Sequence, residues 1–317
     1  MFTFIPYLKA ILSYQNLSIA AEKLSISQPA LSTALKKTEE QLGALIFDRS
    51  QKPWKLTEIG EWYYQYGTDY YNRVDELKSK VIDIQELKCG KLRIGGSNLF
   101  NTTYLTKAIS AFTEKYPGIE ITLVDGTVPE LLNKVQLGEI DLFLTPNFIQ
   151  ASNITYEKIF NERILLCVPR NYKINLELED YQIEKEDIMQ GNTSNFEQTI
   201  KQVSMRMFKD YSFILLQESQ QIGKMFRKMM KEEEVHPKNI IYTNQMTTSF
   251  ALTNAGMGIS LISETAIRYG NFKEFPIFYL CNTDICKREM SIGYYTERYL
   301  SNAAKEIIQI IKYYYNN

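Results

Sequence analysis

The sequence predicts an α/β protein built from three successive parts: a winged helix-turn-helix, one long helix and a larger α/β domain. Three changes of pattern along the chain support this division. Residues 1–58 hold short helical segments separated by tight turns, and residues 58–88 continue as one helical pattern without proline. From residue 91 onward strand patterns alternate with helical patterns, which is typical of βαβ units. A length of 317 residues is sufficient for two or three domains.

The composition is that of an ordinary globular protein, with 44% hydrophobic residues, 23% charged residues and a net charge of −1. Because the chain is not a polycation, any binding to nucleic acid must depend on a local basic patch. The start of the chain lacks the basic segment of a secretory signal, and no apolar stretch reaches the roughly 18 residues of a membrane span. We therefore expect a cytoplasmic protein with no membrane partner.

The first 42 residues contain three helical patterns. In the first pattern apolar residues recur at helical spacing, at Phe4, Leu8, Ile11 and Leu12. A second helix is expected over residues 18–24, with the Ser18 side chain as its N-cap. A third helix is expected to start after a cap at Ser27, because Pro29 is tolerated in a first turn where its missing N–H would be unpaired in any case.

The third helix has two unlike faces. The inner face is mostly apolar and comprises Leu31, Leu35, Thr38 and Leu42. The outer face carries hydrogen-bonding groups near the start of the helix, at Gln28, Ser32, Thr33 and Lys36. Helix-turn-helix proteins place this end in the major groove, where glutamine can bond to adenine and serine or threonine to most base edges. The spacing alone leaves a solvent-exposed amphipathic helix equally open.

The residues after Gly43 predict a wing. A short apolar run at residues 45–47 precedes a polar segment at residues 48–57, which suits two short strands around a loop. Three basic side chains in it would face DNA phosphates: Arg49, Lys52 and Lys55. Residues 1–60 contain seven basic and five acidic residues. Because this surplus is small, affinity for DNA would have to come from clustered contacts and from a dimer that presents two copies.

Four motifs in this region, by their order and spacing, resemble the N-terminal signature of LysR-type transcriptional regulators. They are Ala20-Ala21-Glu22-Lys23-Leu24, Ser25-Ile26-Ser27-Gln28-Pro29-Ala30-Leu31-Ser32, Leu42-Gly43 with Phe47-Asp48-Arg49, and Leu56-Thr57-Glu58-Ile59-Gly60. Thr38 departs from the family pattern, which favours leucine there. The resemblance implies DNA contacts from Gln28, Pro29, Ser32, Thr33 and Lys36, wing contacts near Lys52 and Pro53, and a phosphate contact near Ser18. Together with Ser27 and Arg49, these residues form the predicted DNA-binding surface.

Apolar side chains in the long helix follow a heptad pattern with one additional step of four between Tyr70 and Val74. The positions are Ile59, Tyr63, Tyr66, Tyr70, Val74, Leu77, Val81 and Ile84. A helix of about 30 residues is roughly 45 Å long, more than one small winged domain can cover. Packing against its own domain is the alternative to pairing with a second chain. The resemblance implies pairing, so we expect a homodimer or homotetramer with residues 63–84 in the seam.

The α/β part begins with three expected strands, at residues 91–95, 120–124 and 141–144, separated by helices. Such units form a parallel sheet with right-handed crossovers, and ligands bind beyond the carboxyl ends of the strands. The residues at those ends are Ser97, Asn98, Thr127, Pro146 and Asn147. Hydroxyl groups and helix N-termini there suit a polar or anionic small molecule. Ser97 and Thr127 could equally be plain helix caps.

This part also resembles the LysR-type effector domain, through Tyr116-Pro117, Gly138-Glu139-Ile140-Asp141-Leu142 and Asn254-Ala255-Gly256-Met257-Gly258-Ile259-Ser260-Leu261. The resemblance implies a fold like a periplasmic binding protein, with two lobes joined by crossover strands at residues 164–169 and 290–294. The predicted domains are then residues 1–58, 59–89 and 90–317. Lobe I would span about residues 90–163 and 291–317, and lobe II about residues 164–290.

The second lobe departs from the family pattern at two places. The polar segment at residues 177–211 is longer than usual and would form a lid or a surface excursion. Ile262-Ser263-Glu264 stands where a proline is common. Candidate ligand contacts in this lobe are Gln217, Ser219 and Gln245.

Few residues favour catalysis. The single histidine, His236, precedes a proline and suits a loop, so a Ser–His or Cys–His pair is nearly excluded. Cys281 and Cys286 are close enough in sequence for a redox pair or half of a metal site, but cysteines in the cytoplasm are usually reduced. We expect no catalytic residue, no cofactor and no metal.

The residues and the resemblance together imply a sequence-specific transcription regulator. Its binding to DNA would be modulated by a small polar or anionic effector held between the two lobes of the C-terminal domain. Its partners would be double-stranded promoter or operator DNA, the effector and further copies of itself. The alternatives are a DNA-binding protein with an unliganded, purely structural C-terminal domain, and an enzyme on a binding-protein-like fold. Thermal stabilisation by a ligand would distinguish the effector-modulated regulator from the DNA-binding protein with an unliganded C-terminal domain.

Overall fold

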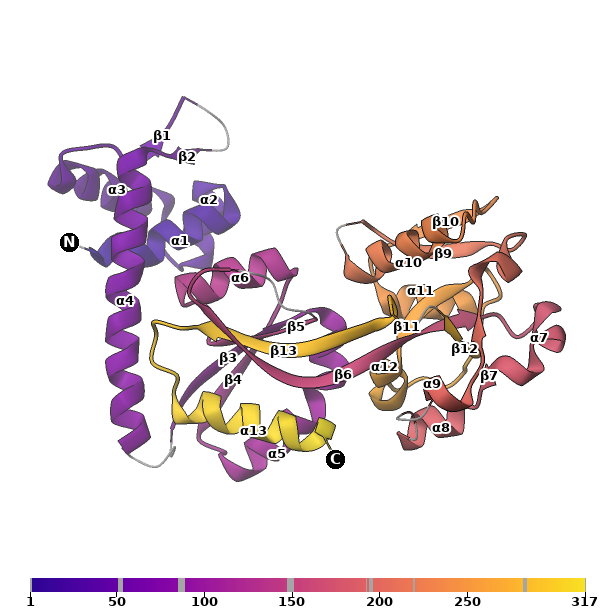
Figure 1. Ribbon diagram of the computed structural model, residues 1–317. Helices are drawn as coiled ribbons and strands as arrows, with labels where there is room; N and C mark the ends of the chain where they lie inside the picture. The colour runs from indigo at the N-terminus through magenta and orange to yellow at the C-terminus, as the bar shows by residue number, and fades with distance from the viewer. Residues whose placement is uncertain are drawn as a thin grey trace. The chain divides into compact units, whose positions relative to one another are not determined.

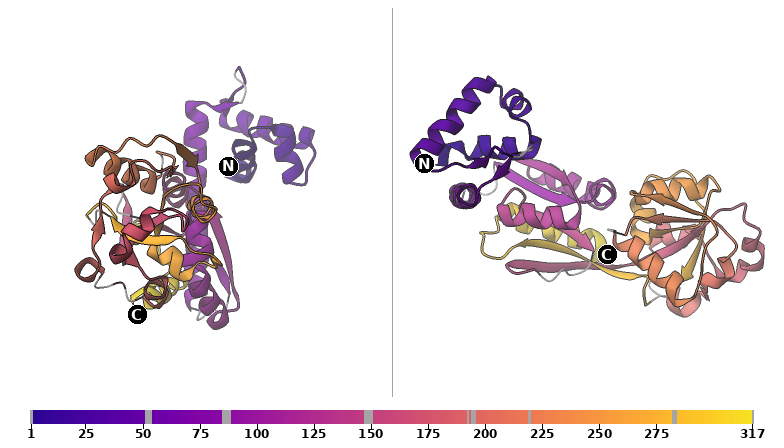
Figure 2. Two further views of the ribbon diagram at one scale, coloured as in Figure 1. Left: turned by 90° about the vertical axis from the view of Figure 1, so that its right-hand side faces the viewer. Right: turned by 90° about the horizontal axis from the view of Figure 1, so that it is seen from above.

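A computed structural model describes residues 2–50, 54–84, 89–146, 151–191, 193, 196–218, 220–281 and 284–316. The chain divides into two compact units, Met1–Glu86 with Gln136–Glu139, and Leu87–Val135 with Ile140–Asn317. The first unit is mainly helical, whereas the second mixes helices with a large sheet (Figure 1, Figure 2). Within the described ranges, no helix combines the length and the apolar character that a membrane crossing needs.

The N-terminal unit has a small helical core, a two-stranded wing and a long helix. Its elements are η1 (Phe2–Phe4), α1 (Ile5–Tyr14), α2 (Leu17–Lys23), α3 (Gln28–Leu42), β1 (Phe47–Asp48), β2 (Lys55–Leu56) and α4 (Glu58–Ile84). The two wing strands pair antiparallel, with Phe47 opposite Leu56. The buried core contains Phe4, Ile5, Leu8, Ile11, Ala20, Ala21, Leu31, Leu35, Ile46, Phe47 and Tyr63. The predicted winged helix-turn-helix is therefore confirmed.

Side-chain caps define where α2 and α3 begin. The Asn16 side chain accepts hydrogen bonds from the backbone N–H of Ser18 (2.9 Å) and of Ile19 (3.1 Å) and so caps α2. The predicted cap at Ser18 is wrong, because α2 starts one residue before Ser18, which therefore lies in the first turn. Ser27 caps α3 as predicted, with its hydroxyl accepting the N–H of Ala30 at 3.3 Å.

Two glycines allow α4 to lie close to the core of this unit. A Cβ atom on Gly60 would lie 2.1 Å from the carbonyl oxygen of Ile46, and one on Gly67 would lie 2.3 Å from the Ile5 side chain. Any larger residue would push the helix away at these points.

Tyr63 lies between these glycines and is only 4% exposed. Its ring centroid is 5.5 Å from that of Phe2, inside the core. The prediction that Tyr63 belongs to the dimer seam is corrected: the side chain packs within its own unit, because the glycines bring this part of α4 against the core.

The C-terminal unit begins with the elements of lobe I. They are β3 (Gly90–Gly96), the π-helical turn η2 (Phe100–Tyr104), α5 (Thr106–Lys115), β4 (Ile119–Asp125), α6 (Val128–Leu137), β5 (Leu142–Pro146) and, at the end of the chain, α13 (Asn302–Asn316). Strands β4, β3 and β5 are parallel neighbours, as predicted. One core contains Leu92 with Phe112 of α5 and Ile307 of α13, and a second contains Phe143 with Leu131 of α6.

Two long strands run side by side between the lobes, β6 (Ile154–Val168) and β13 (Lys287–Tyr295) (Figure 1). They pair antiparallel from Lys287 opposite Arg163 to Tyr295 opposite Ile154. Strand β13 also pairs with β5 of lobe I, whereas the far end of β6 pairs with strands of lobe II. The crossovers expected at residues 164–169 and 290–294 are thus parts of longer strands. The strands β6 and β13 extend beyond the predicted segments because they pair with each other along most of their length.

Lobe II contains the remaining elements. They are α7 (Ile174–Glu177), η3 (Glu179–Tyr181), β7 (Gln182–Ile183), α8 (Lys185–Gln190), α9 (Phe196–Thr199), β8 (Gln202–Val203), η4 (Met205–Phe208), β9 (Phe213–Leu216), α10 (Gln221–Glu232), β10 (Ile240–Thr243), α11 (Met246–Asn254), β11 (Ser260–Ser263), α12 (Glu264–Tyr269) and β12 (Ile277–Cys281). Strands β9 and β10 are parallel, and β11 and β12 pair with β6.

The long segment at residues 177–211 is a structural part of lobe II. Its strands β7 and β8 both pair with β12. Its apolar side chains are buried in the main core, among them Ile183, Ile188, Phe196, Met205 and Phe208. The expectation of a lid or a surface excursion is therefore wrong, because a polar average composition concealed these regularly buried residues.

Candidate nucleic-acid interface and ligand cavity

The start of α3 presents polar side chains to solvent over an apolar inner face. Leu31 and Leu35 are buried, whereas Gln28, Pro29, Ser32, Thr33 and Lys36 are exposed. The Thr33 hydroxyl donates to the carbonyl of Pro29 at 2.8 Å, and the Lys36 ammonium lies 3.8 Å from the Glu40 carboxylate. The groups free to point outward at the first turn therefore include the Gln28 amide and the Ser32 hydroxyl.

A buried carboxylate of α3 holds the wing in place through a hydrogen bond and an ion pair. Glu39 is 6% exposed, and one of its oxygens accepts the backbone N–H of Ile46 at 2.9 Å. Its other oxygen lies 2.5 Å from an Arg49 guanidinium nitrogen, and that guanidinium lies 5.5 Å from the centre of the Trp54 ring. Arg49 was expected to face phosphate, but its ion pair gives it a structural role first. Its side chain remains 46% exposed.

The turn after β1 is stabilised by Asp48. Its carboxylate accepts the Ser50 hydroxyl at 2.6 Å and the Ser50 backbone N–H at 2.9 Å, and these bonds lower the pKa of Asp48. Lys55 is exposed on β2. The predicted wing contacts Lys52 and Pro53 lie outside the described residues.

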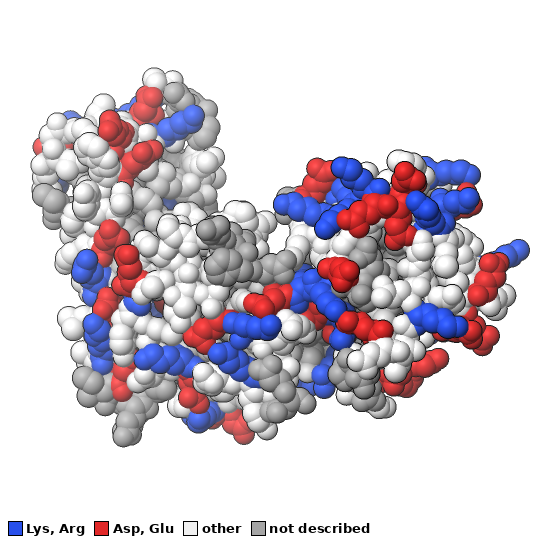
Figure 3. Space-filling view, viewed as in Figure 1, with Lys and Arg blue, Asp and Glu red and all other residues white. Residues whose placement is uncertain are grey.

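An apolar stripe runs along α4. The exposed fractions of its side chains are 65% for Tyr66, 52% for Tyr70, 64% for Leu77 and 48% for Val81, while Val74 is half-buried. The Ile84 side chain lies outside the described part of the chain. In Figure 3 basic and acidic side chains alternate along this helix and are interspersed over the face drawn. Large apolar groups exposed at this spacing suit a second helix.

A cavity of about 760 Å³ lies between the two lobes of the C-terminal unit. Its volume falls in the range of small-molecule sites. Lobe I contributes Ser97, Asn98, Leu99, Phe100, Asp125, Gly126, Thr127, Val128, Pro129, Glu130, Leu131, Leu144 and Pro146. Lobe II contributes Leu216, Gln220, Gln221, Ile222, Asn244, Gln245 and Met246, and the crossover strand β13 contributes Arg288.

Five of the predicted ligand residues line this cavity: Ser97, Asn98, Thr127, Pro146 and Gln245. Gln217 is not among the lining residues, because β9 ends at Leu216 and the Gln217 backbone is used in the following turn, where its carbonyl accepts the N–H of Gln220 at 3.0 Å. Leu216 lines the cavity in its place. Asn147 and Ser219 lie outside the described residues.

Ser97 and Thr127 also make hydrogen bonds in the turns that precede their helices. The Ser97 hydroxyl accepts the N–H of Phe100 at 3.4 Å. Thr127 donates both its N–H (2.7 Å) and its hydroxyl (2.8 Å) to one oxygen of Glu130, which lowers the pKa of that carboxyl group. Ser97 thus acts as a cap, whereas the Thr127 hydroxyl donates to Glu130 and does not accept a helix N–H. Both residues line the cavity, and contact of either with a ligand stays a prediction.

Sequence reasoning missed Arg288 and the amides of Gln220, Gln221 and Asn244. Arg288 is 6% exposed and lies on β13 opposite Glu162 of β6, to which its Nε donates a hydrogen bond. A lone arginine in a strand gives no signal of a cavity. The amides lie at the start of α10 and at the end of β10, two elements that are distant along the chain and whose meeting the sequence does not indicate.

Arg288 and Glu162 belong to a buried polar network that includes both lobes. The Tyr104 hydroxyl, from η2, donates to Glu162 at 2.6 Å and lies 2.7 Å from the hydroxyl of Ser263, the cap of α12. Burial and the Glu162 charge hold the pKa of Tyr104 well above its usual value. Burial alone would lower the pKa of Arg288, but Glu162 raises it, so the guanidinium stays charged. All four residues are less than 7% exposed.

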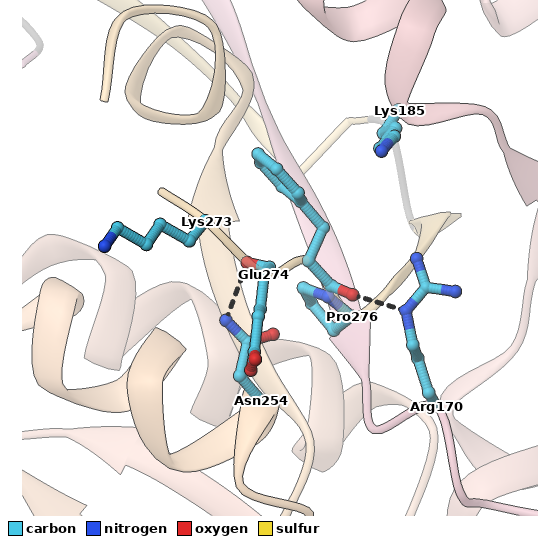
Figure 4. Close-up of a pocket in the computed structure, with 7 residues that line it drawn as sticks. Arg170, Lys185, Asn254, Lys273, Glu274 and Pro276 are labelled. Carbon is cyan, nitrogen blue, oxygen red and sulfur yellow. Dashed lines mark hydrogen bonds between the residues drawn. The ribbon is translucent and has the colours of Figure 1, made fainter. Parts of the chain in front are cut away.

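A smaller pocket of about 270 Å³ lies in lobe II (Figure 4). Arg170 donates from Nε to the Phe275 carbonyl at 2.7 Å, and Asn254 donates to the Glu274 carbonyl at 2.9 Å. Figure 4 shows Lys273 extending away from Arg170, so the basic groups do not converge on one point. The hydrogen bonds fasten the segment before β12 to its neighbours, which is a structural role.

The two nearby cysteines are buried beside each other. The sulfur atoms of Cys281 and Cys286 are 3.6 Å apart, and neither is in a disulfide. The hydrogen bond with Cys286 and burial raise the pKa of the Cys281 thiol well above its usual value, which disfavours the reactive thiolate. Among the described residues, no three or more of His, Cys, Asp and Glu gather into a potential metal site.

Comparison with known proteins agrees with both parts of the structure. A relative described as a probable RuBisCO transcriptional regulator, from Cyanidium caldarium, is 27% identical over 94% of this chain and 89% of its own length. The fold matches full-length OxyR of Pseudomonas aeruginosa with a TM-score of 0.65 at 17% identity, over 98% of this chain and 94% of that one. It matches full-length CbnR, solved in complex with target DNA, with a TM-score of 0.63 at 16% identity, over 99% of each chain.

Two family models cover nearly the whole chain. The model of the bacterial regulatory helix-turn-helix protein, lysR family, matches residues 3–61, and the model of the LysR substrate binding domain matches residues 85–315. The chain belongs to the LysR family of transcriptional regulators.

Proposed function

We propose that this LysR family member acts in the cytoplasm, binds promoter or operator DNA through α3 and the wing, and responds to a small molecule in the cavity between its lobes. The observation that carries the proposal is the start of α3. Its inner residues Leu31 and Leu35 are buried, the Ser27 cap fixes its first turn, and Gln28 and Ser32 are exposed beside it. This is the arrangement that reads base edges in a major groove.

The remaining DNA contacts follow from the same geometry. Asn16 occupies the backbone N–H groups of Ser18 and Ile19, so the exposed Ser18 hydroxyl is the group that would bond to a phosphate. Arg49 would reach a phosphate while keeping its ion pair with Glu39, and Lys52 and Pro53 would extend the contact at the wing. Phosphate contacts of this kind position the domain, and base contacts select the sequence.

Dimerisation through α4 would supply the second copy of the reading helix. The proposed seam comprises Tyr66, Tyr70, Val74, Leu77, Val81 and Ile84. The proposed domains are residues 1–58, 59–89 and 90–317, with the lobes divided along β6 and β13. A homodimer and a homotetramer are both compatible with this proposed seam.

The proposed role of the C-terminal unit is binding without catalysis. Its interlobe cavity combines an apolar lining with a few polar groups, as small-molecule sites do. Membership of a family of regulators supports the same reading. Effector binding would change the relation of the lobes, and a coupling of about 1–3 kcal/mol would be enough to regulate DNA binding.

A binding assay on DNA upstream of the gene for this chain tests the proposal. The wild type is expected to prefer that DNA over a scrambled duplex of the same length at near-physiological salt. Gln28→Ala with Ser32→Ala should weaken specific binding about 10-fold to 100-fold, because one good bidentate base contact, such as glutamine makes, is worth about 1–3 kcal/mol of discrimination.

The matched control is Gln41→Ala, an exposed glutamine at the far end of the same helix. It should bind DNA as the wild type does. The proposal is refuted if the double variant folds normally and keeps full affinity and selectivity, or if the wild type shows no sequence preference at any salt concentration.

A further inference from the structure

Two residues of the interlobe cavity carry buried polar atoms that lack partners. Arg288 and Gln221 both line the cavity. Nη2 of Arg288 and Oε1 of Gln221 are buried, and neither atom has a hydrogen-bond partner among the described residues. Arg288 is more than nine-tenths buried. Buried donors and acceptors are rarely left unpaired in a native protein, and a charged donor is the least tolerated of them. These two atoms are therefore the groups that a bound ligand would satisfy.

The charges around the cavity restrict what that ligand can be. Arg288 is the one cation among the described lining residues, and the buried Glu162 carboxylate already balances it. Asp125 and Glu130, both exposed, add two negative charges on the lobe I side. A ligand with several negative charges would meet two carboxylates and no uncompensated cation.

The rest of the lining is apolar or amide apart from Ser97 and Thr127, whose hydroxyls already bond within lobe I. Its apolar residues include Phe100 and Leu144 of lobe I and Ile222 and Met246 of lobe II. The Gln221 amide can either accept or donate a hydrogen bond once its end is rotated. These surfaces suit an apolar body with one polar head.

From these observations we infer that the cavity takes a small molecule with an apolar body and a single carboxylate or carbonyl group, anchored by Arg288 Nη2 and Gln221, and that it excludes multiply charged anions. The inference rests on the proposed function and narrows the expected polar or anionic effector. The anchor also lies in the network with Glu162, Tyr104 and Ser263, which includes both lobes. A ligand that bonds to Arg288 thus acts at the junction of the crossover strands.

The test uses the full chain and a panel of aliphatic and aromatic monocarboxylates with their primary amides, and citrate and inorganic phosphate as multiply charged anions. Thermal stabilisation and calorimetric titration measure binding. At least one monocarboxylate or amide is expected to bind to the wild type, and citrate and phosphate are expected not to.

Arg288→Lys keeps a cation beside Glu162 but removes the forked Nη2 donor. It should weaken binding of the best probe about tenfold or more, because a hydrogen bond to a charged group is lost. Gln221→Leu should weaken the same probe by a smaller factor. The matched control Arg170→Lys, in lobe II but outside the cavity, should leave binding unchanged, and circular dichroism confirms that each variant is folded.

Three results would overturn the inference: binding of citrate or phosphate more tightly than any monocarboxylate, unchanged affinity in a folded Arg288→Lys variant, or no binding by any monocarboxylate or amide of the panel. DNA binding is measured separately without any probe. A wild type that binds a probe but shows no preference for its own upstream DNA would contradict the proposed regulation and leave the cavity inference standing.

Discussion

The proposed DNA-binding surface of α3 and the interlobe cavity differ in how their side chains are held. The α3 surface comes from one continuous segment, and its polar side chains are exposed and make few contacts within the chain. The cavity comes from several distant segments, and its central residue, Arg288, is buried in an ion pair with Glu162. On α3 the side chains proposed to bind DNA contribute little to folding, whereas in the cavity Arg288, proposed to bind a ligand, also belongs to the buried structure.

This difference indicates at which positions amino-acid substitutions are tolerated. An exposed side chain such as Gln28 can change with little effect on stability, so we expect substitutions there to alter DNA selectivity without unfolding the domain. A buried charge such as Arg288 cannot be removed alone, because its partner would be left unpaired. We expect the selectivity of the cavity for ligands to be easier to alter at a partly buried position such as Gln221 than at Arg288.

Arg288→Ala should give the largest loss of stability and thereby test the claim that the cavity residues are structural. It leaves the fully buried Glu162 without its cation, and the expected loss in free energy of unfolding is about 3–5 kcal/mol. Urea denaturation of the full chain, followed by circular dichroism, measures it. A loss below about 1 kcal/mol would show that Arg288 does not support the fold and would remove the contrast with α3.

A change on the α4 stripe should alter assembly rather than folding. Tyr70→Glu combined with Leu77→Glu places charges on two exposed apolar positions and should convert the assembly to monomers, measured as a mass of about 37 kDa by light scattering. Asp75→Lys, on the same helix but outside the stripe, should retain the mass of the wild type. An unchanged mass in the double variant would contradict the proposed seam.

Glu39→Ala should show that the N-terminal unit also has one structural charge. It removes the acceptor of the Ile46 N–H and the partner of Arg49, and the expected loss is about 1–3 kcal/mol in free energy of unfolding. Affinity for DNA should also fall, because the wing is no longer held to α3. Glu40→Ala, a neighbouring exposed glutamate, is the control and should change stability little. Equal stabilities of the two variants would contradict the structural role of Glu39.

The smallest expected effect is a pH dependence at Glu264. Burial raises the pKa of this carboxyl group, although Arg163 partly opposes the shift. Because the folded state holds the proton more tightly than the unfolded state, the stabilising contribution is full below the ordinary value of 4.5 and is lost as the pH rises through the folded-state pKa. Glu264→Gln should therefore flatten the fall in free energy of unfolding between acidic and neutral pH, and an identical slope in both proteins would refute the assignment.

Local patterns predicted the elements well and their ends less well. The strands expected at residues 91–95 and 120–124 lie within β3 (Gly90–Gly96) and β4 (Ile119–Asp125), because glycine or proline residues and polar turns delimit them. The cap of α2 was misplaced, since Asn16 and Ser18 are both good N-cap residues and only the backbone conformation distinguishes them. The buried character of residues 177–211 was missed because their apolar side chains pack one or two at a time in short elements.

The sequence by itself determined the winged helix-turn-helix, the long helix and the alternation of strands and helices, because caps, glycines and apolar spacing act over a few residues. It also placed the polar start of α3 on the outer face. Only the tertiary structure decided that Tyr63 is a core residue and that Arg288, Gln221 and Asn244 meet Ser97 and Thr127 around one cavity. The physical reason is that burial and pairing of these side chains depend on strands and helices that are distant along the chain, and a sequence pattern carries no record of which of them will meet.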